Sequence, residues 1–301
     1  MAVYDGTHEM AAVAGALRGG VSWGRRLRDR LSVVLSMAAV AVAVIPLGSI
    51  LLWVARQGLS AIDWEFLTSL PKPVGEPGGG MANAIVGTVQ LVTFAGVMAV
   101  PVGVLAGVFL SEFGNTRLAE WVRAITDALT GVPSIVVGIF AYTVLVRPTG
   151  HFSGWAGSFA LAVLMLPVVT RTTEEMIRLV PHSIREASLA LGVPMWRTVL
   201  SVIIPSALPG IVTGVLLALA RVAGETAPLL FTALGNRFWP RSFNEPVAAL
   251  PLQLYVYAKS PYEDWHRQAW GAALVLVGMV LVTSILARLA TARTAGRGGR
   301  S

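Results

Sequence analysis

Charged residues are scarce in this sequence, and their scarcity argues against an ordinary soluble domain. Asp, Glu, Lys and Arg make up 13% of the 301 residues, while the hydrophobic fraction is 55%; soluble domains carry roughly 25% charged residues. Cysteine is absent, which excludes disulfides and thiolate metal sites. The only lysines, Lys72 and Lys259, do not stand in a nucleotide-binding Gly-x-x-x-x-Gly-Lys loop. We therefore expect no ATPase activity in this chain and no cofactor.

Long uncharged stretches take up most of the chain instead. A helix needs about 20 apolar residues to cross a hydrocarbon core of ~30 Å. Windows of that length, one of them interrupted by Asp127, cover residues 31–55, 77–111, 124–146, 148–170, 198–220 and 268–287. We therefore predict an all-α integral membrane protein with six transmembrane helices.

Arginine and lysine are distributed unevenly over the two sides of these spans. With the N-terminus inside, fifteen lie in cytoplasmic segments and seven on the opposite side, and an excess of positive charge marks the cytoplasmic side. Both termini are therefore predicted to be cytoplasmic, and the net charge of +7 requires no nucleic acid. The predicted segments are a tail (1–30), a first span (31–55), an outer loop (56–82), a core with five further spans (83–287) and a second tail (288–301).

Two charged residues stand inside one uncharged stretch. Arg221 and Glu225 are the only charges within residues 211–234, and on a helix their four-residue spacing puts both on one face, about 5–6 Å apart at Cβ. A charge at mid-depth costs at least ~2.5–3.5 kcal/mol and usually marks a substrate path. Counted from Ser206, Arg221 lies about 22 Å along the helix, in the outer half of the membrane. Alternatively, the span ends at Ala220 and Arg221 snorkels to the outer interface.

Other polar residues in the predicted spans give weaker signals. Thr130 and Ser134 flank Pro133, where a loosened helix would expose backbone groups. Arg171 stands at the inner end of the fourth predicted span. These three residues either line a substrate path or serve helix packing and anchoring. Gly210 and Gly214 have the small-xxx-small spacing of a close helix contact.

The cytoplasmic loop over residues 183–210 is predicted to contain a helix, a stop and a return to the membrane. Ser183 has the position of an N-cap, with Glu186 three residues later as in a capping box. Gly192 and Pro194 are expected to end this helix. On these observations alone, the segment is a surface helix that links two spans.

The residue pattern in this loop is similar to the EAA motif of ABC-importer permeases. The resemblance rests on Glu186, Ala187, Ser188, Ala190 and Gly192, followed by Ile204-Pro205. Ser188 replaces the second alanine that many members have. In that family the loop forms a coupling helix that docks on an ATP-binding subunit. The resemblance therefore implies an ATP-binding partner and assigns the coupling contact to these five residues.

Two further segments resemble the permeases of high-affinity phosphate importers more narrowly. These are 131–138 (GVPSIVVG) and 220–233 (ARVAGETAPLLFTA), within a similarity over about 83–286. The resemblance implies a prokaryotic cell-membrane complex with a homologous permease, two ATP-binding subunits and an outer phosphate-binding protein. Arg221 would then bind phosphate, while Glu225 holds Arg221 or accepts a hydrogen bond from protonated phosphate. The alternatives are a permease of the same fold for sulfate or molybdate, and a membrane enzyme or signalling scaffold.

Overall fold

The computed structural model describes residues 23–295. They fall into two compact units, one ending at Trp53 and the other beginning at Val54. The first unit holds most of helix α2 (Trp23–Leu59), and its large apolar side chains are exposed, as expected of a span that faces lipid or another chain. Of the two predicted tails, residues 1–22 and 296–301 lie outside the described residues.

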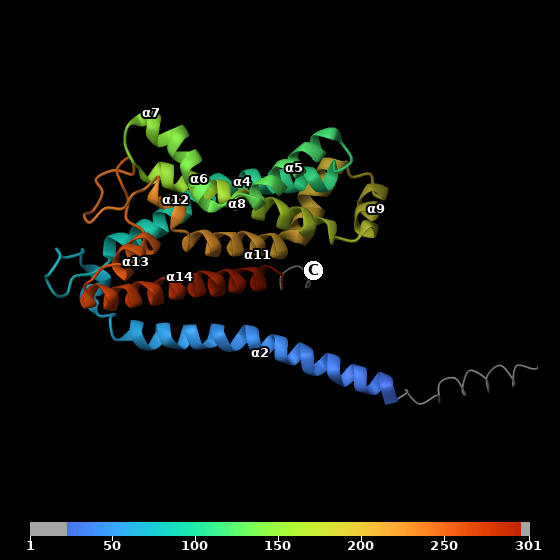
Figure 1. The fold of residues 1–301 in the computed structure, drawn as a ribbon. Coiled ribbons are helices and arrows are strands. Elements are labelled where there is room, and N and C mark those ends of the chain that lie inside the picture. Colours follow the sequence, from blue (N-terminus) through green and yellow to red (C-terminus); the bar gives the residue numbers. More distant parts are fainter. Residues whose placement is uncertain (1–22, 296–301) are drawn as a thin grey trace, which may run out of the picture. The chain divides into compact units, whose positions relative to one another are not determined.

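The regular secondary structure of the second unit consists of helices (Figure 1). Two short π-helical segments extend its α-helices: η1 follows α6, and η2 joins α10 to α11. The elements are α3 (Trp64–Thr68), α4 (Ala82–Glu112), α5 (Arg117–Gly131), α6 (Ser134–Ala141), η1 (Tyr142–Val146), α7 (Arg147–Thr149), α8 (Gly154–Arg178), α9 (His182–Ala190), α10 (Met195–Thr198), η2 (Val199–Ile203), α11 (Ile204–Ala223), α12 (Ala227–Leu230), α13 (Leu250–Ala258) and α14 (Glu263–Ala295). No β-strand occurs within residues 23–295.

Helices α4 and α8 pack against each other along a seam of glycines. A β-carbon on Gly103 would lie 2.8 Å from Cγ1 of Val169, and one on Gly107 would lie 2.6 Å from Cβ of Thr173. Near the other end of the seam, Gly157 of α8 contacts Leu91 of α4. The contacting pairs advance together along both helices, so α4 and α8 are parallel.

The segment between α4 and α8 is bent. Helices α5 and α6 meet at an angle of 107°, across Val132 and Pro133. Val132 is extended, with φ −73° and ψ 128°, because a residue before proline is disfavoured in the helical region. Two parallel helices require the chain between them to return across the same thickness. The third predicted span (124–146) is therefore a broken crossing rather than one helix, and with it the structure has up to six candidate spans.

Helix α11 runs antiparallel to α8 and lies against it through two more glycines. A β-carbon on Gly210 or Gly214 would clash with Met176 or Thr172, respectively, which confirms the close contact predicted from their spacing. Residues 195–223 form one long candidate span, in which α10 and η2 lead into α11. The main apolar core lies where α4, α8 and α11 meet and includes Leu91, Met165 and Ala218.

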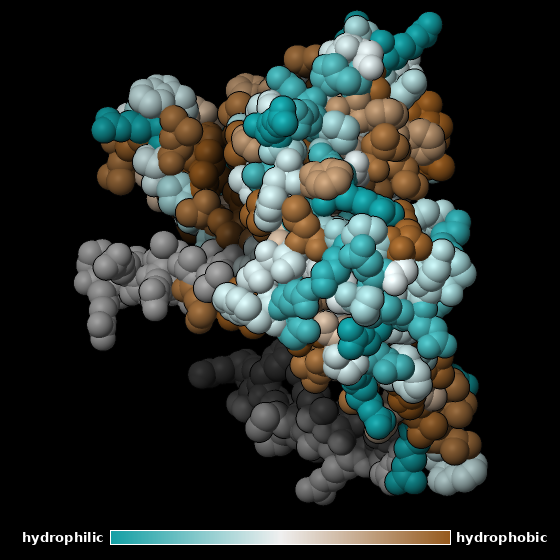
Figure 2. Space-filling model, turned by 90° about the vertical axis from the view of Figure 1, so that its left-hand side faces the viewer, coloured by the Kyte–Doolittle hydropathy of each residue, from teal (hydrophilic) through white to brown (hydrophobic). Residues whose placement is uncertain are grey.

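The longer connecting loops gather at the end of this unit where α4 and α8 begin, here called the loop end. Figure 2 shows this end, where hydrophilic residues cover much of the surface between apolar flanks. Helix α9 lies at the opposite end, after the last turn of α8 (Figure 1), and is called the α9 end. Polar ends and apolar sides are the distribution that a bilayer requires of a helical protein.

Candidate functional site

Arg221 and Glu225 do not share a helix. Helix α11 ends at Ala223, where the backbone N–H of its C-cap Gly224 donates to the carbonyls of Arg221 and Val222. Glu225 follows in the turn, with its N–H bonded to Val222 O at 3.1 Å. The prediction that both side chains project from one helical face was therefore wrong. The cause is Gly224 directly after the last helical residue, an ordinary stop signal.

Arg221 lies on the open side of α11. The buried face of this helix contains Ile211, Gly214, Ala218 and Val222. The exposed stripe contains Ser206, Thr213, Leu217 and Arg221. Glu225 is half-buried, and no ion pair within 4.0 Å joins it to Arg221, both being described residues. The guanidinium is thus available to a ligand or to a second chain.

The register of the helices gives the level of Arg221 within the bundle. Leu219 of α11 contacts Gly96 of α4, where a β-carbon would lie 3.2 Å from the leucine Cδ2. Because the two helices are antiparallel, Arg221 is level with about residue 94 of α4. That level is roughly 18 Å from the start of α4 and roughly 27 Å from its end, at about 1.5 Å per residue. The snorkelling alternative required the span to end at Ala220, but helix α11 continues to Ala223.

Two breaks in the helical crossings lie side by side. One is the bend at Pro133 between α5 and α6, and the other is the turn between α11 and α12. They meet where Gly138 of α6 packs against Pro228 of α12, whose Cα would lie 2.6 Å from a glycine β-carbon. In the uncharged stretch 226–234 that follows, Leu229 and Ala233 are buried in the protein core. Broken helices at membrane depth are typical of transporter substrate sites.

The weaker polar candidates lie on or near the bent crossing. Thr130 is exposed and its hydroxyl donates to Thr126 O at 2.9 Å. Ser134 is the first residue of α6 and half-buried. Arg171 of α8 forms an ion pair with Asp127 of α5, and both side chains stay about half exposed, at 45% and 46%. This pairing could not be predicted, because the two residues are 44 positions apart along the chain.

Arg171 lies at a different level from Arg221. By the register of the α4–α8 seam it is level with about residue 105 of α4, roughly 16 Å from the level of Arg221 toward the α9 end, at about 1.5 Å per residue. Arg171 and Arg221 are therefore exposed at two different depths of the candidate spans.

Helix α9 carries the residues of the EAA-like motif. Glu186, Ala187 and Ala190 are exposed, and Gly192 adopts φ +79° just beyond the helix. Ser188 faces inward instead: it is buried, and its hydroxyl lies 2.9 Å from that of Thr198. The predicted stop after the helix is confirmed, because Leu191 is the C-cap and α10 starts after Pro194.

The predicted start of this helix was wrong. Helix α9 begins at His182 with Pro181 as its N-cap and no side-chain cap bond. Ser183 is therefore already inside the first turn, where its hydroxyl cannot serve as the N-cap. Pro181 has φ −57° and ψ 138°, a non-helical conformation of the kind that an N-cap residue adopts.

Buried carboxylates at the α9 end hold several helices together. Glu112, the last residue of α4, accepts two hydrogen bonds of 2.8 Å each from Arg185 of α9. Glu174 of α8 binds Arg123 of α5 at 2.9 Å and Arg178 of its own helix at 2.6 Å. The Glu112 and Glu174 side chains are only 3% and 5% exposed. Sequence analysis identified neither cluster, since the partners come from different helices.

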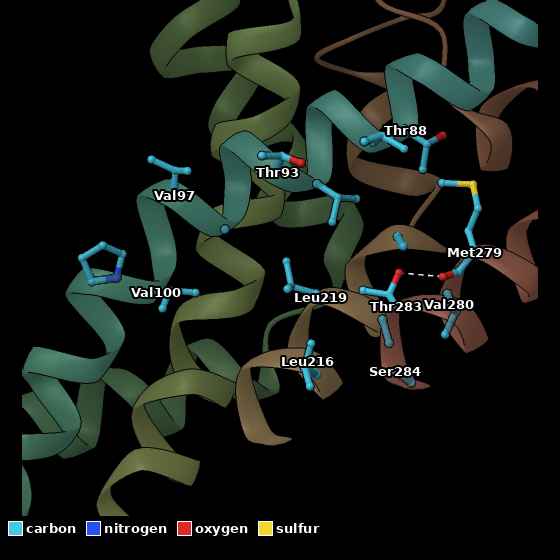
Figure 3. Close-up of a pocket in the computed structure, with 16 residues that line it drawn as sticks. Thr88, Thr93, Val97, Val100, Leu216, Leu219, Met279, Val280, Thr283 and Ser284 are labelled. Carbon is cyan, nitrogen blue, oxygen red and sulfur yellow. Dashed lines mark hydrogen bonds between the residues drawn. The ribbon is translucent and has the colours of Figure 1, made fainter. Parts of the chain in front are cut away.

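A cavity of about 600 Å³ opens between α4, α11 and α14 (Figure 3). Its walls are apolar, with a few hydroxyls such as those of Thr88, Thr93 and Thr283; the last donates to Met279 O at 2.6 Å. No charged residue is among those that line it, so it offers no guanidinium or ammonium group to an anion. Ala220 and Ala223 line it, whereas Arg221, between them, does not.

Solved structures with a similar fold are ABC transporters. The inward-facing MetNI methionine ABC transporter matches with a TM-score of 0.56 and 21% identity, over 71% of this chain and 94% of that chain. A bacterial alginate ABC transporter in complex with an alginate-bound periplasmic protein matches with a TM-score of 0.61 and 11% identity, over 93% and 99%. At these identities the comparison shows the fold alone, which is that of a multi-pass ABC importer permease.

Sequence relatives define the family. Residues 99–296 match the family described as binding-protein-dependent transport system inner membrane component. The phosphate transport system permease protein PstA of Yersinia pestis is 45% identical over 270 residues, 89% of this chain and 92% of the relative. PstA 1 of Mycobacterium tuberculosis (strain ATCC 25618 / H37Rv) is 38% identical over 271 residues, 88% of each. The chain belongs to this family of inner-membrane transport components.

Proposed function

We propose that this chain is the permease subunit of an ATP-driven importer of inorganic phosphate and forms half of its translocation pore. Relatives named as phosphate transport permeases match almost the whole chain at 38–45% identity. The observation that carries the proposal is the exposed guanidinium of Arg221 at mid-bundle depth. The chain supplies the path, and ATP hydrolysis belongs to a separate subunit.

The exposed charges explain why a second permease is needed. Arg221, Arg171 and Asp127 are exposed on the isolated chain, and charged groups that face lipid are costly. They therefore face a water-filled path enclosed by this chain and a homologous permease subunit. Thr130 and Ser134 lie on the same bent crossing as Asp127 and complete the proposed lining.

Phosphate suits an arginine site. The planar guanidinium of Arg221 offers two parallel N–H donors to two phosphate oxygens. Glu225 lies outside the helix that holds Arg221, so the turn at Gly224 can bring it toward the arginine or away from it. When the turn brings it close, the carboxylate neutralises Arg221; when phosphate is bound, it accepts a hydrogen bond from a protonated oxygen. Competition for Arg221 also lets the anion leave.

Coupling to ATP hydrolysis is assigned to α9 on the cytoplasmic side. Glu186, Ala187 and Ala190 form its exposed surface, and Gly192 allows the sharp turn that follows. This surface docks on the ATP-binding subunits, while the loop end faces an extracytoplasmic phosphate-binding protein. Movement of α9 then shifts the spans around Arg221, which produces alternating access.

Substitution of Arg221 tests the proposal. In the complete complex in proteoliposomes, Arg221→Gln is expected to abolish phosphate uptake without loss of assembly. The matched control is Arg147→Gln, at an exposed arginine of α7, which should transport at the wild-type rate. Wild-type uptake in Arg221→Gln contradicts the role of the arginine. Uptake of sulfate or molybdate in place of phosphate contradicts the substrate assignment.

A further inference from the structure

The contact between Glu112 and Arg185 is a two-pronged ion pair with one partner almost fully buried. Arg185 Nη1 and Nη2 each lie 2.8 Å from one carboxylate oxygen of Glu112. The glutamate side chain is 3% exposed and that of Arg185 20%. A bidentate pair fixes orientation as well as distance. The start of α9 is thereby held in a defined position on the last turn of α4.

Helix α9 is otherwise lightly attached. Most of its residues are exposed, and Ser188 is its buried residue, bonded to Thr198 of α10. The Ser188–Thr198 contact joins α9 to α10, which continues through η2 into α11. The Arg185–Glu112 contact joins α9 to α4. Of the ion pairs among the described residues, Arg185–Glu112 is the one that joins α9 to another helix.

Movement of α4 cannot remain confined to that helix. Its glycines Gly103 and Gly107 bring it into direct contact with α8, so the two helices move together. Glu174 of α8 in turn binds Arg123 of α5, which is the first half of the bent crossing. A displacement of α9 at Arg185 therefore reaches the bend at Pro133 through packed helices and buried ion pairs.

We propose that Glu112 and Arg185 are positioning residues that transmit the movement of α9 to the α4–α8 pair, so that ATP hydrolysis drives opening of the path. The proposal rests on the proposed function, because it concerns how that transport is coupled. Neither residue is among those assigned above to the phosphate path or to the docking surface of α9. Their loss should let ATP hydrolysis continue while phosphate transport falls.

The test is the number of phosphate ions imported per ATP hydrolysed by the purified complex in proteoliposomes. Glu112→Gln keeps the size of the side chain but removes its charge. We expect the complex to assemble and hydrolyse ATP at close to the wild-type rate, with phosphate per ATP reduced about tenfold, within the range found for residues along coupling networks. The charge-reversed double variant Glu112→Arg/Arg185→Glu should recover a large part of the ratio.

Glu175→Gln is the matched control, because this carboxylate lies beside Glu174 on α8 but is exposed; its ratio should equal that of the wild type. A wild-type ratio in Glu112→Gln overturns the coupling role. If ATP hydrolysis and phosphate uptake fall by the same factor in Glu112→Gln, the coupling role is also overturned, because Glu112 then contributes only to the structure of the complex. Absence of phosphate uptake by the wild-type complex would contradict the proposed function instead, so the two failures are distinguishable.

Discussion

Gly138 and Pro228 form the contact at which the two broken crossings touch. A β-carbon on Gly138 would approach the proline Cα to 2.6 Å and its carbonyl oxygen to 3.2 Å. Both atoms belong to the backbone of Pro228, so they cannot move away as the end of a flexible side chain could. The separation between α6 and the turn after α11 is therefore set by the absence of a side chain at this glycine.

Gly138→Ala should disturb this contact. The added methyl group forces α6 and α12 apart, at an expected cost of about 1–3 kcal/mol, and should lower both the thermal midpoint of the purified complex and its phosphate uptake. Gly131→Ala is the control, because nothing lies within 4 Å of a β-carbon there. Equal behaviour of the two variants would show that the α6–α12 contact is not tightly packed.

The Arg171–Asp127 pair allows a role in transport to be distinguished from a role in helix packing. If Arg171 lines the path, Arg171→Gln lowers phosphate uptake, and addition of Asp127→Asn does not restore it. If the pair is only structural, the double variant should do better than Arg171→Gln, because neither charge is then left alone at membrane depth. We expect the first result, measured as initial uptake rates in proteoliposomes.

The hydroxyl pair Ser188–Thr198 is expected to stabilise the loop after α9. Thr198→Val keeps the shape of the side chain but leaves the Ser188 hydroxyl buried without its partner, at an expected cost of about 1–3 kcal/mol. The double variant Ser188→Ala/Thr198→Val should lose less stability, because both polar groups are then gone. Thermal unfolding of the complex measures the difference; additive losses would contradict direct pairing.

The loop before α4 should respond to acid. The Lys72 side chain, 2.9 Å from Glu65, is the main cause of a lowered pKa for Glu65, together with the Gly79 N–H. The contribution of the carboxylate to loop stability is therefore complete above its unfolded pKa of about 4.3 and is lost as pH falls through its lower folded pKa.

A spin label can follow this change, since the chain has no cysteine of its own. A label on Val74→Cys, at an exposed position of the loop, should become more mobile at about pH 3 than at pH 7. With Glu65→Gln the label should already be mobile at pH 7. A Gln variant with wild-type mobility at pH 7 would show that Glu65 does not hold the loop.

Features set by composition could be predicted from the sequence. Uncharged windows located the candidate spans because the hydrocarbon core imposes a minimum length on any helix that crosses it. The spacing of Gly210 and Gly214 predicted a close helix contact. Pro133 was recognised as a site where the helix loosens, although the 107° bend was not predicted, since its size depends on how α6 packs against α12.

Features set by contacts between distant residues could not be predicted. The partners Glu112 and Arg185 come from different helices, as do Asp127 and Arg171. Their pairing depends on the register of those helices. The end of α11 at Ala223 agrees with Gly224 as a stop signal directly after the helix. In this chain that signal outweighs the four-residue spacing that predicts Arg221 and Glu225 on one helical face.

The glycine seam between α4 and α8 limits where a pore can open. Close packing over most of the length of both helices leaves no room for an ion between them, and separation would expose the backbone around Gly103 and Gly107 to lipid. We therefore expect the distance between α4 and α8 to stay constant through the transport cycle. In the proposed importer we expect the aperture to widen instead on the exposed side of α11, where Thr213 and Arg221 are open.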